Sequence, residues 1–197
     1  MTQSSEGTLT LIAPSVEYRD SYIAALREHQ AQGRFLDNRH IDNDVGALTR
    51  DFERLVRTLC NAADPAYIKP GFVPETFLWM IESRTNELVG RASIRHQLSD
   101  EPSLRDIGHI GYDIRPSRQG RGYGKTILGL TLDAARRLGM ERVLVTCDSN
   151  NLRSKSIIEH WGGVFERSVP LAGREYVRLR FWIDLGSRGT RAPGARW

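Results

Sequence analysis

The stretch RQGRGYGKT at residues 118–126 places three glycines and three cations within nine residues. Glycines let a ligand approach the main chain without meeting a β-carbon, and Arg118, Arg121 and Lys125 supply mobile positive charge. The residues that follow have a helical pattern, and the first turn of a helix leaves main-chain N–H groups free to bind an anion. The stretch therefore predicts a phosphate site, although a flexible surface loop would have the same composition.

Spacing separates three phosphate-binding patterns. A Walker A loop needs an opening glycine, but Gln119 stands there in this chain,. A dinucleotide-binding loop needs G-x-G-x-x-G, but Lys125 occupies the third glycine position,. The pattern Q/R-x-x-G-x-G/A is satisfied by Gln119, Gly122 and Gly124. Only this third pattern fits every position.

The elements around the loop are predicted from hydrophobic periodicity and from turn residues. We expect strands at residues 8–14, 75–83, 87–97, 109–114, 142–147, 164–169 and 175–185, and helices at residues 16–32, 45–62, 123–138 and 150–161. The loop then lies between a strand and a helix, and another strand and helix follow. This order predicts a crossover unit in a mixed α/β fold.

Composition limits the class of protein. The 197 residues carry a net charge of +4, but the last twelve residues contain three arginines and no acid, so the remainder has 25 basic against 24 acidic residues. We therefore expect one domain at residues 1–185, a basic flexible tail at residues 186–197, and no nucleic-acid partner. Two cysteines at no metal spacing, with no long apolar run and no leader pattern, predict a cytoplasmic protein without metal or membrane contact,.

The segments YDIRPSRQGRGYGKTILGLTLDAA and VTCDSNNLRSKSIIEHWGG together resemble the GNAT superfamily of acetyl-CoA-dependent N-acetyltransferases. The resemblance covers roughly residues 8–185 in element order and is specific in sequence at residues 109–165. The segments GRASIRHQL, GHIGYDIRPS and VTCDSNN look more narrowly like predicted acetyltransferases without a settled substrate. The resemblance implies an α/β (α+β) fold with a mostly antiparallel central sheet, a central parallel strand pair and flanking helices. It also implies acetyl-CoA as cosubstrate.

The resemblance also implies which residues hold coenzyme A. Main-chain amides of Gln119, Gly120, Arg121, Gly122, Tyr123 and Gly124 would bind the pyrophosphate, and Arg118, Arg121 and Lys125 the outer phosphates. Ile114 and Arg115 would pair through their main chains with the pantetheine arm, and the Ile114 amide would polarise the thioester carbonyl. Asn151 and the neighbouring Ser154 would lie beside the pantetheine.

The catalytic residues are less well defined. Many members of the superfamily have a Tyr seven residues after the Asn to protonate the leaving thiolate, but Ile158 stands there in this chain. Ser154 and Ser156 are nearby hydroxyls, and Ser156 is a catalytic candidate. His109 is our candidate general base, because an imidazole titrates near neutral pH. Strict strand alternation puts His109 and Tyr112 on opposite faces, so Tyr112 is a competing candidate for proton transfer.

Cys147 ends an apolar strand with no evident base beside it, so a buried core residue is expected there and a covalent acetyl-cysteine is not,. Tyr18, Tyr22, Phe35 and Trp79 are expected in the core. One of Arg95 and His96 should face the active-site cleft, because the two alternate along one strand. Asp37, Asp42 and Asp44 in the segment 33–44 could contact a cationic acceptor or form a solvated loop.

The sequence predicts transfer of acetyl from acetyl-CoA to a primary amine of a small molecule by direct attack in a ternary complex. Two alternatives stay open: a protein N-terminal or lysine acetyltransferase, and an acyl-CoA-binding module without turnover. A nucleotide-hydrolysing P-loop fits the sequence less well than these alternatives, because the opening glycine is missing. The edge strands of a split sheet make a homodimer plausible. No motif in the early helices identifies the acceptor amine.

Overall fold

A computed structural model of the protein describes residues 7–33, 44–101 and 106–186. The helices are α1 (Arg19–Ala31), α2 (Val45–Arg50), α3 (Phe52–Asn61), α4 (Tyr123–Arg137) and α5 (Leu152–His160). The strands are β1 (Leu9–Ile12), β2 (Glu75–Glu82), β3 (Glu87–Arg95), β4 (Ile110–Ile114), β5 (Arg142–Asp148), β6 (Val164–Pro170) and β7 (Val177–Asp184). These strands form one sheet in the order β1-β2-β3-β4-β5-β7-β6, antiparallel except between β4 and β5. The predicted fold class is confirmed.

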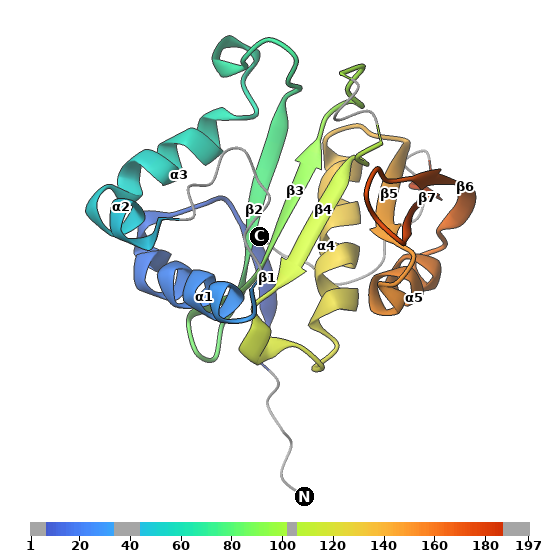
Figure 1. The fold of residues 1–197 in the computed structure, drawn as a ribbon. Helices are drawn as coiled ribbons and strands as arrows, with labels where there is room; N and C mark the ends of the chain where they lie inside the picture. Colours follow the sequence, from blue (N-terminus) through green and yellow to red (C-terminus); the bar gives the residue numbers. More distant parts are fainter. Residues whose placement is uncertain (1–6, 34–43, 102–105, 187–197) are drawn as a thin grey trace, which may run out of the picture.

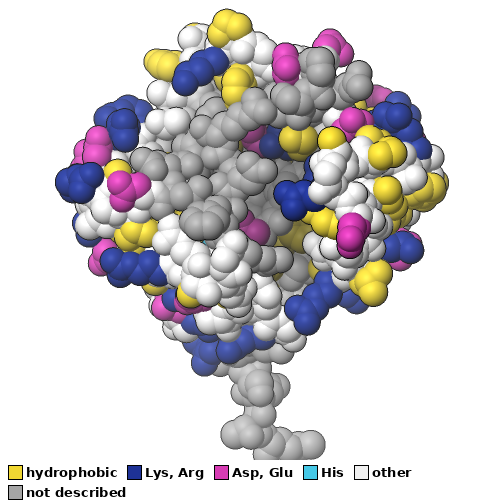
Figure 2. Space-filling view, in the orientation of Figure 1, with side chains coloured by type: hydrophobic (Ala, Val, Ile, Leu, Met, Phe, Trp, Pro, Cys, Tyr) yellow, Lys and Arg dark blue, Asp and Glu magenta, His cyan; other side chains and the backbone are white. Residues whose placement is uncertain are grey.

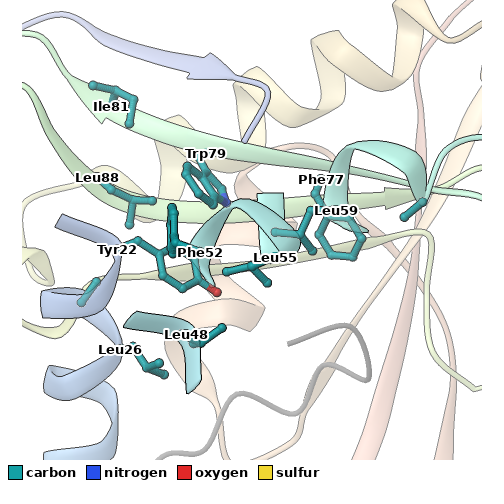
Figure 3. Close-up of a cluster of buried hydrophobic side chains, with 12 residues drawn as sticks. Tyr22, Leu26, Leu48, Phe52, Leu55, Leu59, Phe77, Trp79, Ile81 and Leu88 are labelled. Carbon is teal, nitrogen blue, oxygen red and sulfur yellow. The ribbon is translucent and has the colours of Figure 1, made fainter. Parts of the chain in front are cut away.

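Helices cover both faces of the sheet: α1, α2 and α3 lie on one side, and α4 and α5 lie on the other (Figure 1). Successive side chains of a strand point to opposite faces, so each strand contributes to two cores. On β2, Phe77 and Trp79 pack beneath α1–α3, whereas Met80 packs with Ile127 of α4. The Tyr22 and Trp79 rings, 5.0 Å apart, stand at the centre of the first core (Figure 3).

The predicted helix at residues 45–62 is two helices. Asp51 breaks it with a non-helical backbone (φ −140°, ψ 63°), and its carboxylate accepts a hydrogen bond from the Arg54 amide to begin α3. Asp44 begins α2 in the same way, through bonds from the Gly46 and Ala47 amides. Aspartate favours such capping positions because its short side chain reaches the free first-turn amides. Hydrophobic periodicity runs through both helices and does not reveal the break.

The parallel strands β4 and β5 meet at Ile110 and Val145 and make no further residue pair along the described chain. Just before this contact, a β-carbon on Gly108 would lie 2.4 Å from the Leu144 carbonyl oxygen, so the close approach requires glycine,. The His109 amide donates to the Leu144 carbonyl at 2.7 Å, and the Leu144 amide donates to His109 Nδ1 at 2.8 Å. His109 therefore joins the two strands, with its ring 5.9 Å from that of Trp182.

The structure bears on only some of the predictions about partners and compartment. Among the described residues, no helix is long and apolar enough to cross a membrane, and no group of three acidic, His or Cys side chains could hold a metal ion.

Exposed apolar side chains gather on α5 and the edge strand β6 (Figure 2): Leu152, Trp161, Val164 and Phe165. Homodimer formation and the domain boundary stay predictions, and tail residues 187–197 lie outside the described chain.

We expect His109 to make the fold sensitive to acid. Burial, and then the charges of Arg95 and Arg142, lower the pKa of His109 from 6.5 to about 4,. Between these pH values the unfolded chain binds a proton that the folded chain does not, so the free energy of unfolding falls as the pH falls from about 6.5 to about 4. The His109→Gln variant should lose part of this decline, because glutamine cannot be protonated.

Denaturant unfolding at a series of pH values between 7 and 4 would measure this effect. The matched control is His160→Gln, which removes an imidazole that is exposed at the end of α5 rather than hydrogen-bonded between two strands. An identical acid decline in wild type and His109→Gln would contradict the structural role.

Candidate functional site

A cleft of about 1220 Å³ opens where β4 and β5 separate. It is walled by β3, β4, the loop before α4, the first turn of α5 and single residues or pairs from α1, α3, β2 and β5. Most residues predicted from the sequence line it: Tyr112, Ile114, Arg118, Gln119, Gly120, Gly122, Tyr123, Gly124, Lys125, Asn151, Ser154 and Ser156. His109, Arg115 and Arg121 are not among its lining residues.

The main chain of β4 presents one edge to this cleft. The Arg115 amide donates to the Val89 carbonyl and the Arg95 amide to the His109 carbonyl, so every second residue of β4 is bonded to β3,. The residues between them, Tyr112 and Ile114, therefore direct their amide and carbonyl groups toward β5, beyond the last β4–β5 pair. The Ile114 carbonyl accepts one bond, from Gln119 Nε2 at 3.2 Å. This edge can pair with an extended ligand in place of a strand.

The structure limits the predicted main-chain contact between Arg115 and the pantetheine arm. Its main-chain amide is already bonded to β3, and its guanidinium donates to Glu28 of α1 at 2.7 Å. Its amide is therefore not available to an extended ligand, and its side chain is buried in an ion pair. Of the two predicted main-chain contacts, only Ile114 faces the cleft.

The start of α4 has free first-turn amides that no side chain of the described residues caps. Gly120 and Gly122 have φ values of +78° and +81°, which side-chain-bearing residues rarely adopt,. These conformations turn the chain into α4, and no side chain caps the helix at Gly122. The first-turn amides of this fifteen-residue helix thus point into the cleft with the positive end of the helix dipole,.

The cations near this helix start divide into two groups. Arg118 forms ion pairs with Glu82 and Glu87, while Arg121 and Lys125 have no ion-pair partner among the described residues. The predicted phosphate role of Arg118 is therefore limited by its pairing, because it must leave two carboxylates to bind an anion. Hydrogen bonds from Tyr123 and then Thr85, with the charge of Arg118, lower the pKa of Glu82 despite burial. Arg118 and Tyr123 thus tie the glycine loop to the β2–β3 hairpin.

Tyr112 and Ser154 meet across the cleft. Their hydroxyl oxygens are 3.2 Å apart and share a hydrogen bond between β4 and the first turn of α5. Burial raises the pKa of Tyr112, so its hydroxyl stays protonated at neutral pH,. The Asn151 side chain caps α5 by accepting a bond from the Ser154 amide at 3.1 Å. Tyr112 can therefore donate a proton within the cleft.

Three further residues bear on the chemistry. Ile158, at the position where many members of the superfamily have a tyrosine, is fully buried in the core beneath α4 and α5. Cys147 is buried, and burial together with Asp148 raises its pKa to about 11, so a thiolate nucleophile is disfavoured at neutral pH,. Ser156 lines the cleft but is exposed, and no hydrogen bond fixes its hydroxyl in the described structure.

A charge cluster that the sequence did not reveal lies on the α1–α3 face of the cleft. Arg91 of β3 donates to both carboxylate oxygens of Asp113, at 3.3 and 2.5 Å, and also to the Tyr22 hydroxyl at 3.4 Å. His29 Nε2 lies 3.5 Å from Asp113 Oδ1. Burial raises the pKa of Asp113, but the charge of Arg91, the proximity of His29 and the hydrogen bonds from Arg91 outweigh it and leave the pKa lowered. Asp113 is therefore ionised at neutral pH.

The position of Asp113 follows from the strand contact. Ile110 and Val145 are paired and point into the core beneath α4, so the residues three positions later, Asp113 and Asp148, lie level with each other on the opposite face,. Both line the cleft, and Asp148 is bonded to Arg178. The alternation was visible in the sequence, but the pairing register was not.

The remaining predictions near this face have mixed outcomes. Arg95 lines the cleft, while His96 Nε2 is bonded to Thr76 at 2.8 Å. Tyr22 and Trp79 are core residues as predicted, and Tyr18 packs partly buried beside them. Asp44 caps α2, and the other predicted residues of this segment, Phe35, Asp37 and Asp42, lie outside the described chain.

Comparison with known proteins gives one family and several relatives. The family model described as an acetyltransferase (GNAT) domain matches residues 8–164. The chain is 26% identical over 106 residues to the L-amino acid N-acyltransferase MnaT of Escherichia coli (strain K12). That match covers 54% of this chain and 59% of the relative, so the chain aligns with about three fifths of that protein's length.

Solved structures share the fold at low sequence identity. The microcin C7 self immunity acetyltransferase MccE, in complex with acetyl-CoA and AMP, has a TM-score of 0.62 at 15% identity, with 92% of this chain and 93% of that chain covered. The dodecameric spermidine N-acetyltransferase of Vibrio cholerae has a TM-score of 0.61 at 17% identity, with 90% and 94% covered. With the family model matching most of its length, this chain belongs to the GNAT acetyltransferase domain family.

Proposed function

We propose that the protein transfers an acetyl group from acetyl-CoA to a primary amine of a small molecule, by direct attack within a ternary complex. The observation that carries the proposal is the open edge of β4 at Tyr112 and Ile114 beside the uncapped start of α4, both in one cleft. An extended pantetheine arm needs the first feature, and a pyrophosphate needs the second. The family membership supports the same cosubstrate.

In this proposal the pyrophosphate binds the first-turn amides of α4, and Lys125 and Arg121 contribute charge at its outer side. The pantetheine extends along β4, and the Ile114 amide donates to the thioester carbonyl oxygen. When the amine attacks, charge develops on that oxygen, and an N–H group already directed at it stabilises the transition state. Holding both substrates in one cleft supplies the orientation that a covalent intermediate would otherwise provide.

The bond changes are simple. The amine lone pair forms the C–N bond, the carbonyl electrons move to oxygen, and collapse of the tetrahedral intermediate breaks the C–S bond. Tyr112 lies on the α5 side of β4 and donates its hydroxyl proton to the departing sulfur,. Ser154 shares a hydrogen bond with this hydroxyl and orients it.

On the α1 side of the cleft the described lining includes charged or titratable side chains from α1, β3, β4 and β5 that could bind a small amine. The relatives named above act on an L-amino acid and on spermidine, both of which are small amines. A peptide acceptor would need an open groove across the same face.

The wild-type protein should bind acetyl-CoA and release coenzyme A in the presence of one class of amine. The measurement combines calorimetry of acetyl-CoA binding with thiol release over amino acids, polyamines, aminoglycosides and short peptides. Binding with turnover of small amines supports the proposal, and turnover of peptides alone would replace it with a protein acetyltransferase. Binding without any turnover would favour an acyl-CoA-binding module, and no binding would reject the site.

The Gly122→Ala variant should weaken acetyl-CoA binding by about tenfold or more, because a methyl group would be added beside the first-turn amides. Gly139→Ala is a matched control: Gly139 ends α4 with φ +84°, and its added β-carbon, like that of Gly122, would meet no atom within 4 Å. Both variants should lose similar stability, but only Gly122→Ala should change the dissociation constant measured by calorimetry. Equal affinity in the two variants would argue against pyrophosphate binding at this loop.

The Tyr112→Phe variant should lower kcat by roughly 10- to 100-fold and leave the acetyl-CoA dissociation constant unchanged, because it removes a proton donor and keeps the ring. Steady-state kinetics with saturating amine would measure kcat. Tyr18→Phe removes a hydroxyl that bonds Asn86 outside the cleft and should leave kcat at the wild-type value. A kcat within twofold of wild type in Tyr112→Phe would exclude Tyr112 as the acid.

A further inference from the structure

His29 is a buried imidazole with one polar atom unused. Its side chain is 4% exposed, and Nε2 has no hydrogen-bond partner among the described residues. The nearest acceptor, Asp113 Oδ1, lies 3.5 Å away, which is too long for a good hydrogen bond,. A buried imidazole nitrogen usually has a partner, so an unused one at the wall of a cleft points to a ligand,.

The Asp113 carboxylate provides the second half of this site. Its side chain is 37% exposed, although Arg91 and His29 lie against it, so it can be reached from the cleft. When its ring proton is on Nδ1, His29 Nε2 is an acceptor, and it lies 3.5 Å from Asp113 Oδ1,. Both atoms can then receive hydrogen bonds from one donor group placed beside them. A primary amine carries two N–H bonds and matches this arrangement.

The location of His29 and Asp113 also suits an amine that attacks a thioester lying along β4. Asp113 follows Tyr112 on β4 and points to the opposite face, toward α1, while Ile114 presents its amide to the gap between the strands,. An acceptor bound on the α1 side would approach a thioester lying along β4 from the face opposite Tyr112. The leaving sulfur and the attacking nitrogen would then be served by different side chains.

We propose that His29 and Asp113 form the amine subsite, in which Asp113 accepts a hydrogen bond from the acceptor nitrogen and His29 Nε2 receives its proton. This inference rests on the proposed acetyl transfer and deepens it by assigning the base. The neutral amine forms the C–N bond, and its N–H proton moves to His29 Nε2 to give an imidazolium. Asp113 stabilises the positive charge that develops on nitrogen, and Tyr112 protonates the sulfur. Solvent then returns His29 and Tyr112 to their starting forms.

Charged and titratable groups surround His29 on each neighbouring element: Asp113 on β4, Arg91 on β3, Tyr22 on α1, the Arg115–Glu28 pair at the end of α1, and Asp148 across the gap on β5. Burial raises the pKa of Tyr22, and the pKa of Asp113 is lowered, so neither changes charge near neutral pH. Within this group only an imidazole ordinarily titrates between pH 5 and 8. His109, whose pKa is lowered to about 4, would not titrate in that range.

The test is the pH dependence of kcat/KM for the best small amine of the panel, with acetyl-CoA saturating. In the wild type both the amine and the general base must be unprotonated to react, so log kcat/KM should rise with a slope near two at low pH and a slope near one at higher pH. The His29→Gln variant should keep a slope near one throughout, because only the amine then titrates. Its kcat/KM at pH 8 should fall by about 100-fold or more, as expected for loss of a general base.

His96→Gln is the matched control, since His96 is bonded to Thr76 and does not line the cleft. It should keep the wild-type profile. Calorimetry of acetyl-CoA binding on each preparation shows that the fold is intact, and His29→Asn serves as a second variant if His29→Gln does not bind.

A slope of two retained in a His29 variant, or kcat/KM within threefold of wild type, would overturn the assignment of the base. Loss of that slope in His109→Gln instead would transfer the role to His109. Either result leaves the proposed acetyl transfer standing, whereas a wild type that acetylates no amine removes both.

Discussion

The separation of β4 from β5 is the constraint on which the rest of the structure depends. Each strand is hydrogen-bonded along its outer edge, β4 to β3 and β5 to β7, and within the described residues the only β4–β5 strand pair is Ile110 with Val145. Gly108 and the two bonds between His109 and Leu144 hold this contact closed at one end. Beyond it the strands cannot pair with each other, so the β4 main chain needs water or a ligand to satisfy its polar groups. The cleft is therefore a consequence of how the sheet is joined.

Ion pairs hold the glycine loop at the open end of this gap. Glu28 of α1 binds both the Arg115 side chain and the Ser117 amide, and Glu82 and Glu87 of the β2–β3 hairpin bind Arg118. These contacts join three parts of the chain at the start of α4 and fix the direction of its first-turn amides. They also use the two arginines closest to the strand, so in the proposed complex the main chain and the helix dipole would carry more of the anion binding than the composition of the loop suggests.

Local periodicity and spacing predicted the glycine loop and the order of the elements apart from the break between α2 and α3, and the family resemblance implied the parallel strand pair,. The sequence did not predict which side chains meet across elements. Arg118 carries the same charge whether it binds phosphate or Glu87, and His109 has the same chemistry whether it lies in a cleft or accepts a bond from Leu144. Asp113 was visible as an alternating strand residue, but its contacts with Arg91 and His29 depend on strand register and on how α1 packs. Single-residue roles thus required the tertiary structure.

Neighbouring residues of one strand explain how the site can work with Ile158 where a tyrosine was expected. Ile158 is buried beneath α4 and α5, so α5 offers no phenol there, and Tyr112 reaches the first turn of the same helix from β4. Because side chains alternate along a strand, Tyr112 and Asp113 necessarily point to opposite faces. A thioester lying along β4 would then have a proton donor on the side of its sulfur and an acceptor on the side of the incoming amine. Two proton transfers in opposite directions need such a separation, since a donor and an acceptor on one side would exchange the proton with each other.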